Sequence, residues 1–545
     1  MPLRVADFFC GGGGFSEGFR QAGFEIVFAV DKWLPAVNTY KGNKPGVNVI
    51  QDDVIRISQL PDEEFDALVP DTEVIIGSPP CQSFSHSNRS GNGDKTLGIQ
   101  LFEAYLRIIA RKMFKEDSIL QYWILENVPD IKKHIKEEYT AEELGLEGNF
   151  ILNTHCAASG EYNAKYYGAP TNRKRYLCGN FPAPERVRDD TNLITLGEVL
   201  ASLGDPLNDG NDLVQDINNP GFTLHRDAIT DHHYLYELAE FEYETSRRLK
   251  QDKGYMGRMA FPENLDKPAR TVMATMTASA REAMILGYGE GQYRLPTVRE
   301  AACMMSFPID YWFYGESKGV KHTLVGNAVP PKLSYALARA IAEAENEPIP
   351  SHYIPIDHPD NLEFYNLNGA HFDIKVEQPK KENAKFKYHI PYLIYDAYRV
   401  ELTNYHSDFT NNCYKWTAEI HYSQGKEKAK CYSPHITLRL IPEKYKDDVR
   451  QFINEMQRLI PNMNAFQQVY CMTAAERGNQ RYYGPFELLR AVRRFIDEMV
   501  PVDEQQNRIP VRKITINGKS AQIPLAIVIG YYVLERAMSY MGRLH

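Results

Sequence analysis

Cysteine is scarce in this chain, with eight residues among 545 and no pair spaced as CxxC. This scarcity excludes a disulfide scaffold and a zinc ribbon, so we expect no metal cofactor and a reducing, cytoplasmic setting. Long apolar runs are also lacking, because the longest, Ile523 to Leu534, is too short to cross a bilayer and contains Gly530. The first residues, MPLRVADFF, show no charged leader before an apolar stretch. We therefore expect neither membrane association nor a secretory signal.

Positive charge is in deficit, with 62 Lys and Arg against 71 Asp and Glu and a net charge of −9. The deficit is uneven along the chain. Residues 351–545 hold 26 basic and 22 acidic residues, a net charge of +4, which leaves −13 for residues 1–350. A negative total does not exclude a nucleic-acid partner. It implies that any basic face is local and that its affinity depends on salt.

The length of 545 residues predicts more than one domain, since single cores seldom grow beyond about 250–300 residues. Short apolar runs alternate with helical patterns over the first 130 residues, which predicts a parallel sheet with helices on both faces. Ligands of such sheets bind at the carboxyl ends of the strands. Residues 182–265 lose this alternation and indicate an inserted small domain. We expect a return to the first domain over 266–345, a proline-rich linker over 346–359 and an α+β domain over 360–545.

The first candidate site follows the first predicted strand and reads Asp7 to Phe15, with four glycines from Gly11 to Gly14. Glycines at this point let the backbone turn sharply and approach a ligand closely. Asp31 ends the second predicted strand, where a carboxylate can bind a ribose diol. The alternative is an ordinary tight turn. The pattern is not GxGxxG, so NAD is not favoured.

The second candidate site is Gly77 to Ser85, directly after a buried strand-like run. Two prolines precede Cys81, and a cysteine at a strand's carboxyl end can be activated as a nucleophile. The alternative is a small residue buried in a turn, which is the commoner role of a lone cysteine. The polar stretch that follows, 86–98, contains three glycines and is typical of a lid over a site.

Two further sites carry charge. Glu126 ends another buried strand, where a carboxyl group is costly unless it has a partner or a chemical task. The alternative is a carboxylate at a helix N-terminus. Arg173 and Arg175 are spaced by two, which would place both on one face of a strand. They could orient a carboxylate or a phosphate, although such a pair is more often a solvated basic patch.

A further motif, Gly326-Asn327-Ala328-Val329, follows these four. Together the five motifs match the pattern of one known enzyme family in both order and spacing. Over about residues 3–345 the chain resembles the cytosine-C5 DNA methyltransferase family. The resemblance implies a Rossmann-like, S-adenosylmethionine-dependent methyltransferase sheet of α/β class, with a target-recognition domain over 182–265. The added α+β domain lies outside the resemblance. The resemblance also implies a prokaryotic, cytoplasmic enzyme that acts on double-stranded DNA and belongs to a restriction–modification or defence system.

The resemblance implies roles for single residues. Cys81 would add to carbon 6 of a flipped cytosine, Glu126 would contact ring N3, and Arg175, with Arg173 beside it, would contact the base carbonyl. Residues expected to bind the cofactor, S-adenosylmethionine, and its product S-adenosylhomocysteine are Phe9, Gly11, Gly13, Asp31, Asp53, Pro79, Asn327 and Val329. Residues expected to contact DNA are Gln82, Ser85 and Arg89.

Departures from the family pattern are confined to scaffold positions. Thr171 replaces a usual Gln, and Cys303 and Met305 replace a usual Arg and Gln. Two alternatives stay open: methylation of cytosine in transfer RNA, and a DNA-binding adaptor without catalysis. Intact Cys81 and Glu126 argue against the second.

The C-terminal segment gives weaker signals. Asp360, Asp373 and Lys375 are similar to a metal-dependent nuclease set, but three such residues often match by chance. His421 and His435 resemble a paired-histidine phosphoesterase but lie too close together, so a strand surface fits better. The positive charge and many tyrosines suit contact with DNA, a protein partner or a cognate nuclease, and equally an ordinary core.

Overall fold

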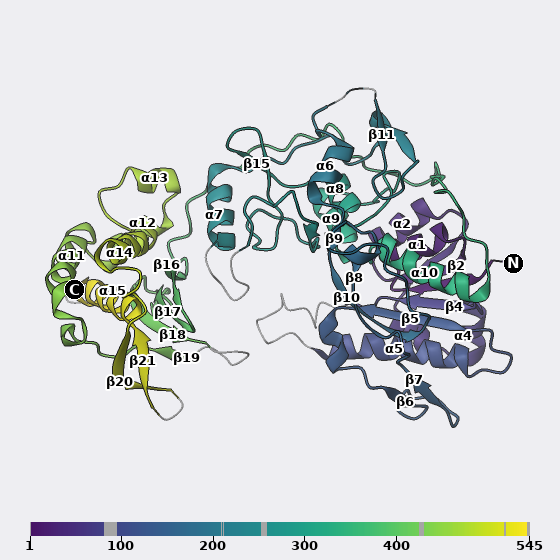
Figure 1. Cartoon of the computed structure of the whole chain (residues 1–545), viewed down its shortest axis with the longest axis horizontal. Coiled ribbons are helices and arrows are strands. Elements are labelled where there is room, and N and C mark those ends of the chain that lie inside the picture. Colours follow the sequence, from purple (N-terminus) through teal and green to yellow (C-terminus); the bar gives the residue numbers. More distant parts are fainter. Residues whose placement is uncertain are drawn as a thin grey trace. The chain divides into compact units, whose positions relative to one another are not determined.

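The computed structural model describes residues 2–80, 95–208, 210, 212–251, 259–423, 430–516 and 519–541. These residues form two compact units (Figure 1). The first comprises Met1–Ser246 and Ala260–Ile374, and the second comprises Arg247–Met259 and Lys375–His545. Among the described residues no helix is long and apolar enough to cross a membrane. Each unit is described below by itself.

The first unit is built on a seven-stranded mixed sheet of order β3-β2-β1-β4-β5-β10-β8. Five neighbouring strands run parallel, which confirms the expected sheet at the positions where apolar runs were found. The strands are β1 Arg4–Phe8, β2 Glu25–Asp31, β3 Asn48–Gln51, β4 Val74–Gly77, β5 Tyr122–Asn127, β8 Gly160–Asn163 and β10 Lys174–Asn180.

Helices cover both faces of this sheet, as expected (Figure 1). Successive strand residues such as Val5 and Ala6 enter different cores, because side chains alternate between the two faces. One face packs α1 Gly14–Gln21, α2 Leu34–Asn43 and α10 Pro331–Glu345, and the other packs α3 Val54–Ser58, α4 Asp62–Leu68 and α5 Lys95–Met113. Helices α1 and α10 approach closely at Gly18, where an added Cβ would lie 2.2 Å from Ser334 Oγ.

The last two strands depart from the expected all-parallel sheet. β10 runs antiparallel to β5, and β8 runs antiparallel to β10. A parallel neighbour needs a long crossover, usually a helix. Residues 128–173 instead hold the 3-10 turns η1 Pro129–Lys133 and η2 Ala164–Tyr167 and the short strands β6 Glu138–Thr140, β7 Ile151–Asn153 and β9 Thr171–Asn172. The chain therefore returns to the sheet as a hairpin.

The segment expected to be an inserted domain, 182–265, shares one apolar core with later residues. Leu196, Val199 and Ile229 lie in the same cluster as Val272 and Leu324. The elements of this lobe are α6 Leu196–Leu203, β11 Leu213–Gln215, β12 Thr223–His225, η3 Arg226–Ala228, α7 Glu240–Gln251, β13 Ala269–Arg270, β14 Leu286–Tyr288, β15 Gln292–Arg294, α8 Val298–Met304 and α9 Lys318–Asn327. A buried ion pair between Lys321 and Asp231 (2.7 Å) lies within it.

The stretch expected to be a linker, 346–359, packs on the first unit. Tyr353 donates a hydrogen bond to Asp310 (2.7 Å), and the His358 ring stacks on Trp312 at 3.9 Å between ring centroids. Further along, the Leu367 backbone donates to Asp231. The first unit consequently extends to Ile374, beyond the proline-rich stretch.

The second unit is α+β, as expected for the C-terminal part. Its four-stranded antiparallel sheet has β16 Lys387–Tyr395, β17 Tyr398–Thr403, β18 Thr417–Tyr422 and β19 Lys430–Tyr432. Its longer helices are α11 Lys446–Leu459, α14 Pro485–Met499 and α15 Leu525–Met541. Further elements are η4 Leu438–Leu440, η5 Glu443–Tyr445, α12 Met463–Cys471, α13 Ala474–Gly478 and the hairpin of β20 Arg508–Ile516 with β21 Lys519–Pro524.

Candidate active site

The glycine turn after β1 is shaped by positive backbone angles. Gly11 has φ 52° and Gly13 has φ 78°, a region that side chains rarely adopt. An added Cβ at Gly13 would lie 2.5 Å from Tyr311 Oη and 3.0 Å from Lys44 Nζ, whereas one at Gly11 would meet nothing within 4 Å. The turn is therefore closely packed at Gly13 and open at Gly11, so a ligand can approach the backbone there.

Two carboxylates flank this turn. The Gly11 backbone donates to Asp31 (2.9 Å) at the end of β2, and burial raises the pKa of Asp31. Asp53 caps α3 by accepting from the Ile55 backbone and pairs with Lys32 at 2.8 Å. Burial alone would raise the pKa of Asp53, but these hydrogen bonds lower it. Both expected cofactor contacts therefore lie at the carboxyl ends of β2 and β3, beside the turn.

A buried polar network supports the turn from within. The Lys44 Nζ lies 3.3 Å from the Gly13 carbonyl, 3.0 Å from Tyr311 Oη and 3.4 Å from Glu17. Burial raises the pKa of Asp7, at the end of β1, to about 7. Sequence reasoning missed Lys44 and Tyr311, which are far from the glycines in the chain and give no local signal.

Glu126 is held at the end of β5 by two side chains. Its Oε1 lies 2.7 Å from Arg175 Nε, and its Oε2 accepts from Ser78 Oγ at 2.6 Å. The Glu126 and Arg175 side chains are only 5% and 10% exposed. Oε1 is a buried atom that receives no aligned hydrogen bond from the described residues, so the Arg175 contact is an ion pair that leaves acceptor capacity on this oxygen. Ser78 was not singled out from the sequence.

Arg173 does not join Arg175, although their spacing predicted a shared face. Arg173 lies between β9 and β10 and donates to the carbonyls of Val272 (3.0 Å), Gly326 (2.9 Å) and Ala328 (3.0 Å). It therefore ties β10 to the loop that carries Asn327 and Val329. Its geometry is that of a positioning residue.

The remaining expected cofactor residues lie around the same strand ends. The Pro79 carbonyl accepts from the Asn127 side chain at 2.9 Å, which joins the ends of β4 and β5. Val329 is buried, and an added Cβ at Gly14 would lie 2.4 Å from its carbonyl oxygen. Phe9 is half-buried at φ 55°, and Asn327 is exposed at the end of α9. Cys81, Gln82, Ser85 and Arg89 lie outside the described residues, which resume at Lys95.

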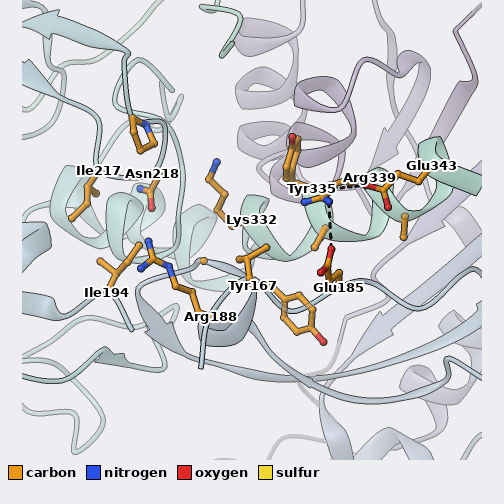
Figure 2. A pocket seen from close by; sticks show the side chains of 15 residues that line it. Tyr167, Glu185, Arg188, Ile194, Ile217, Asn218, Lys332, Tyr335, Arg339 and Glu343 are labelled. Carbon is orange, nitrogen blue, oxygen red and sulfur yellow. Dashed lines mark hydrogen bonds and ion pairs between the residues drawn. The ribbon is translucent and has the colours of Figure 1, made fainter. Parts of the chain in front are cut away.

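A cavity of about 330 Å³ lies elsewhere in the first unit (Figure 2). Figure 2 shows Lys332, Tyr335, Arg339 and Glu343 along α10 on one side, and Ile194, Ile217 and Asn218 on the other. No expected site residue that the structure describes lines this cavity. Those residues gather instead at the strand ends, around the glycine turn and Glu126.

Comparison with known proteins identifies the family of the first unit. The family model described as C-5 cytosine-specific DNA methylase matches residues 3–343. Type II methyltransferase M.MthTI of Methanothermobacter thermautotrophicus is 30% identical over 355 residues, covering 63% of this chain and 97% of the relative. Type II methyltransferase M.HgiDI of Herpetosiphon aurantiacus is 29% identical over 358 residues, covering 64% and 96%.

Among solved structures, the Entamoeba histolytica methyltransferase EhMeth superposes with a TM-score of 0.42 at 14% identity, covering 64% of this chain and all of that chain. The family match ends at residue 343, so it leaves the second unit unassigned. Since it covers more than half of the chain, this protein belongs to the C-5 cytosine-specific DNA methylase family and is a DNA (cytosine-5)-methyltransferase.

Proposed function

We propose that this enzyme methylates carbon 5 of cytosine within a specific sequence of double-stranded DNA, through a covalent adduct of Cys81. The supporting observation is the setting of Glu126, a buried carboxylate at a strand's carboxyl end, with one oxygen that receives no aligned hydrogen bond from the part of the chain that the structure describes. Asn127, the next residue, binds the Pro79 carbonyl two residues before Cys81. The chain just before the expected nucleophile is thus joined to the end of the strand that carries Glu126.

The family implies S-adenosylmethionine as the methyl donor. When bound, this cofactor supplies a methyl group on a positively charged sulfur. The turn at Gly11 is open to a ligand, and Asp31 and Asp53 are placed to accept hydrogen bonds from its ribose and adenine. Phe9, Gly13, Pro79, Asn327 and Val329 complete the proposed binding residues. The charge of the carboxylates also suits a cationic donor.

Carbon 5 of cytosine is a poor nucleophile, and the proposed residues raise its nucleophilicity. Cys81, as a thiolate, forms a bond to carbon 6 and pushes the ring electrons toward carbon 5 and N3. Glu126 contacts N3 and stabilises the charge that develops there, while Arg175 holds both Glu126 and the base carbonyl oxygen. After methylation the carbon 5 proton leaves and the Cys81 bond to carbon 6 breaks, which restores the aromatic ring.

A stacked cytosine cannot reach this site, so the base has to leave the duplex. The proposed target-recognition segment is 182–265, of which 182–246 and 260–265 belong to the first unit. Gln82, Ser85 and Arg89 are the proposed DNA contacts close to Cys81 in the sequence. The relatives are named type II methyltransferases. We infer a modification role in a prokaryotic restriction–modification or similar defence system in the cytoplasm, with the second unit free for a protein partner or a cognate nuclease.

Bisulfite sequencing of DNA from cells that express the protein tests this proposal directly. We expect full protection of cytosine at one short sequence and no protection in cells that express Cys81→Ser. Methylation of transfer RNA with unmodified DNA would replace the proposed substrate. Unmodified DNA and RNA together with intact DNA binding would indicate an adaptor without catalysis.

A mechanistic trap tests the covalent step. A duplex with 5-fluorocytosine at the methylated position should form an adduct that survives denaturing electrophoresis, because fluorine cannot leave carbon 5 as a proton does. Cys81→Ser should form none. An active enzyme that yields no adduct would contradict the proposed role of Cys81.

A further inference from the structure

The sheet of the second unit has two chemically different faces. Ile390, Val400, Leu402 and Ile420 point into the apolar core beneath α14 and α15. Because side chains alternate along each strand, the intervening residues share the other face. That face carries titratable side chains from all four strands: Lys387, His389, Arg399, Glu401, Glu419, His421 and Cys431.

Cross-strand pairing brings four of these groups together around one imidazole. Arg399 and Cys431 are the direct neighbours of His421 on β17 and β19, and Glu401 is paired with Glu419. His421 is 2% exposed. Its Nε2 lies 2.9 Å from Glu401 Oε2, 3.1 Å from Glu419 Oε2 and 3.5 Å from Cys431 Sγ.

The single Nε2 donor of His421 faces two carboxylate oxygens. One N–H at Nε2 points toward Glu419, which accepts its hydrogen bond, and so cannot also point toward Glu401. Accordingly Glu401 Oε2 receives no hydrogen bond from the described residues, and neither does the buried Nε2 of His389 on the adjacent strand. Orphaned buried polar atoms are rare in native proteins and call for a missing partner. The Glu401 oxygen lies 2.9 Å from His421 Nε2 and 3.4 Å from Lys387 Nζ without an aligned hydrogen bond, so it is open to a bound cation.

The ligand set selects the kind of cation. Three potential ligand atoms lie within 4.8 Å of one another: a carboxylate oxygen of Glu419, a ring nitrogen of His421 and the sulfur of Cys431. A thiolate with an imidazole suits Zn²⁺, whereas Mg²⁺ and Ca²⁺ prefer oxygen ligands only. We propose that Glu419, His421 and Cys431 bind one Zn²⁺, with Glu401 beside the fourth coordination position. The early expectation of no metal rested on the lack of CxxC pairs, and this set needs none.

The neighbouring charges fit this proposal. Arg399 holds the other oxygen of Glu401 at 2.5 Å, and Lys387 lies 3.4 Å from Glu401 and 3.6 Å from Glu419. His406 contacts the outer oxygen of Glu419 at 3.3 Å. Arg399 and His406 hold the outer oxygens and orient both carboxylates, as supporting groups do around metal ligands. Lys387 is the cation that lies against the oxygens facing His421, so Zn²⁺ binding displaces its ammonium group.

Binding requires one proton to leave. A cysteine coordinates zinc as the thiolate, so Cys431 gives up its proton on binding. Zn²⁺ replaces that proton, the S–H bond gives way to a Zn–S bond, and the proton passes to the buffer. The ion reaches the site because Cys431 is exposed. It would tie the three-residue edge strand β19 to β18.

The test uses the full-length protein, freed of metal by a chelator and titrated with Zn²⁺ alone. We expect one tight equivalent, with about one proton released when the titration is repeated in buffers of different ionisation heat. Cys431→Ser should weaken binding at least about 100-fold, since it removes one of three ligands. Cys413→Ser is the matched control, because Cys413 is also exposed in the second unit and should leave binding unchanged.

Two further measurements keep the result decisive. Co²⁺ in the unmodified protein should give the absorption of a thiolate-bound tetrahedral ion, which does not depend on any variant folding. Mg²⁺ should not compete. Absence of a tight Zn²⁺ equivalent, a Co²⁺ spectrum without thiolate character, or equal Zn²⁺ affinity in the folded Cys431→Ser protein would overturn the proposal, because the cluster would then be an ion-pair network only. DNA methylation is not needed for any readout.

Discussion

Replacing Glu126 by Gln separates the catalytic use of this residue from its structural use. Glutamine preserves the shape of the side chain and an oxygen that can accept from Ser78, but it removes the negative charge that faces Arg175. The pair lies 2.7 Å apart and is almost fully buried. The substitution therefore tests a single property, the charge and proton-binding capacity of this carboxyl group.

The expected loss in stability is small. A hydrogen bond or contact to a charged group contributes about 1.5–3 kcal/mol, and a neutral one about 0.5–1.5 kcal/mol. The first unit should therefore lose about 1–3 kcal/mol, because the glutamine oxygen can still accept from Arg175 but the buried guanidinium loses its counter-charge. Arg175→Met should cost more, about 3–5 kcal/mol, because it removes one partner of a buried ion pair and leaves Glu126 uncompensated.

The expected loss in activity is much larger. A positioned acid–base group typically contributes about 10²–10⁴-fold to rate, so Glu126→Gln should slow single-turnover methyl transfer by that factor on saturating DNA. Cofactor affinity should change less than about twofold, since Glu126 lies on β5 and the glycine turn follows β1. Methyl transfer is followed with radiolabelled cofactor, and cofactor affinity by calorimetry.

Glu142→Gln serves as the control, because Glu142 is an exposed carboxylate of the same unit. A near-normal rate for Glu126→Gln would refute the assignment of Glu126 to the reacting base. A parallel loss of rate, cofactor affinity and thermal stability would refute it too, since Glu126 would then be a scaffold residue.

Three other outcomes are expected. Gly13→Ala should weaken cofactor binding at least about 10-fold in calorimetry. Gly46→Ala is the control and should leave binding intact, because Gly46 also has a positive φ of 92° but an added Cβ there meets nothing within 4 Å. Equal effects of the two substitutions would contradict the packing argument. Lys321→Met should destabilise the first unit by about 3–5 kcal/mol in denaturant unfolding, and adding Asp231→Asn should recover most of this, because both side chains are fully buried. Burial raises the pKa of Asp7 from 3.8 to about 7, so the native state retains a proton that the unfolded chain loses. The free energy of unfolding should therefore fall as pH rises from about 4 to 7. Thermal unfolding across this pH range should show that Asp7→Asn flattens the slope.

The sequence by itself determined the strands and helices of the sheet and the order of the catalytic motifs. These features are local: apolar runs of period two or 3.6, glycines where the backbone turns, and charged residues directly after buried strands. Asp31 and Glu126 stood out because a strand end at the edge of a parallel sheet is where such groups gather. The same local logic predicted the α+β class of the second unit.

The local sequence did not predict that β10 runs antiparallel to β5. It also did not predict that the Arg173 and Arg175 side chains lie in different places. A spacing of two implies a shared face only if the strand continues. Here β9 pairs with β13, about 100 residues away, and the strand breaks at Arg173. The position of each guanidinium group therefore depends on which strand its segment pairs with, and the local sequence does not specify that partner.

The groups around Glu126 and around His421 were likewise decided by tertiary structure. Ser78 and Arg175 are each almost 50 residues from Glu126, and they meet it because β4, β5 and β10 are neighbours in the sheet. His421 by itself was indistinguishable from a residue on a strand surface. Only the register of β17, β18 and β19 places two carboxylates and a thiol around it. Register depends on which faces can be buried together, and that is a property of the folded chain and not of any short segment.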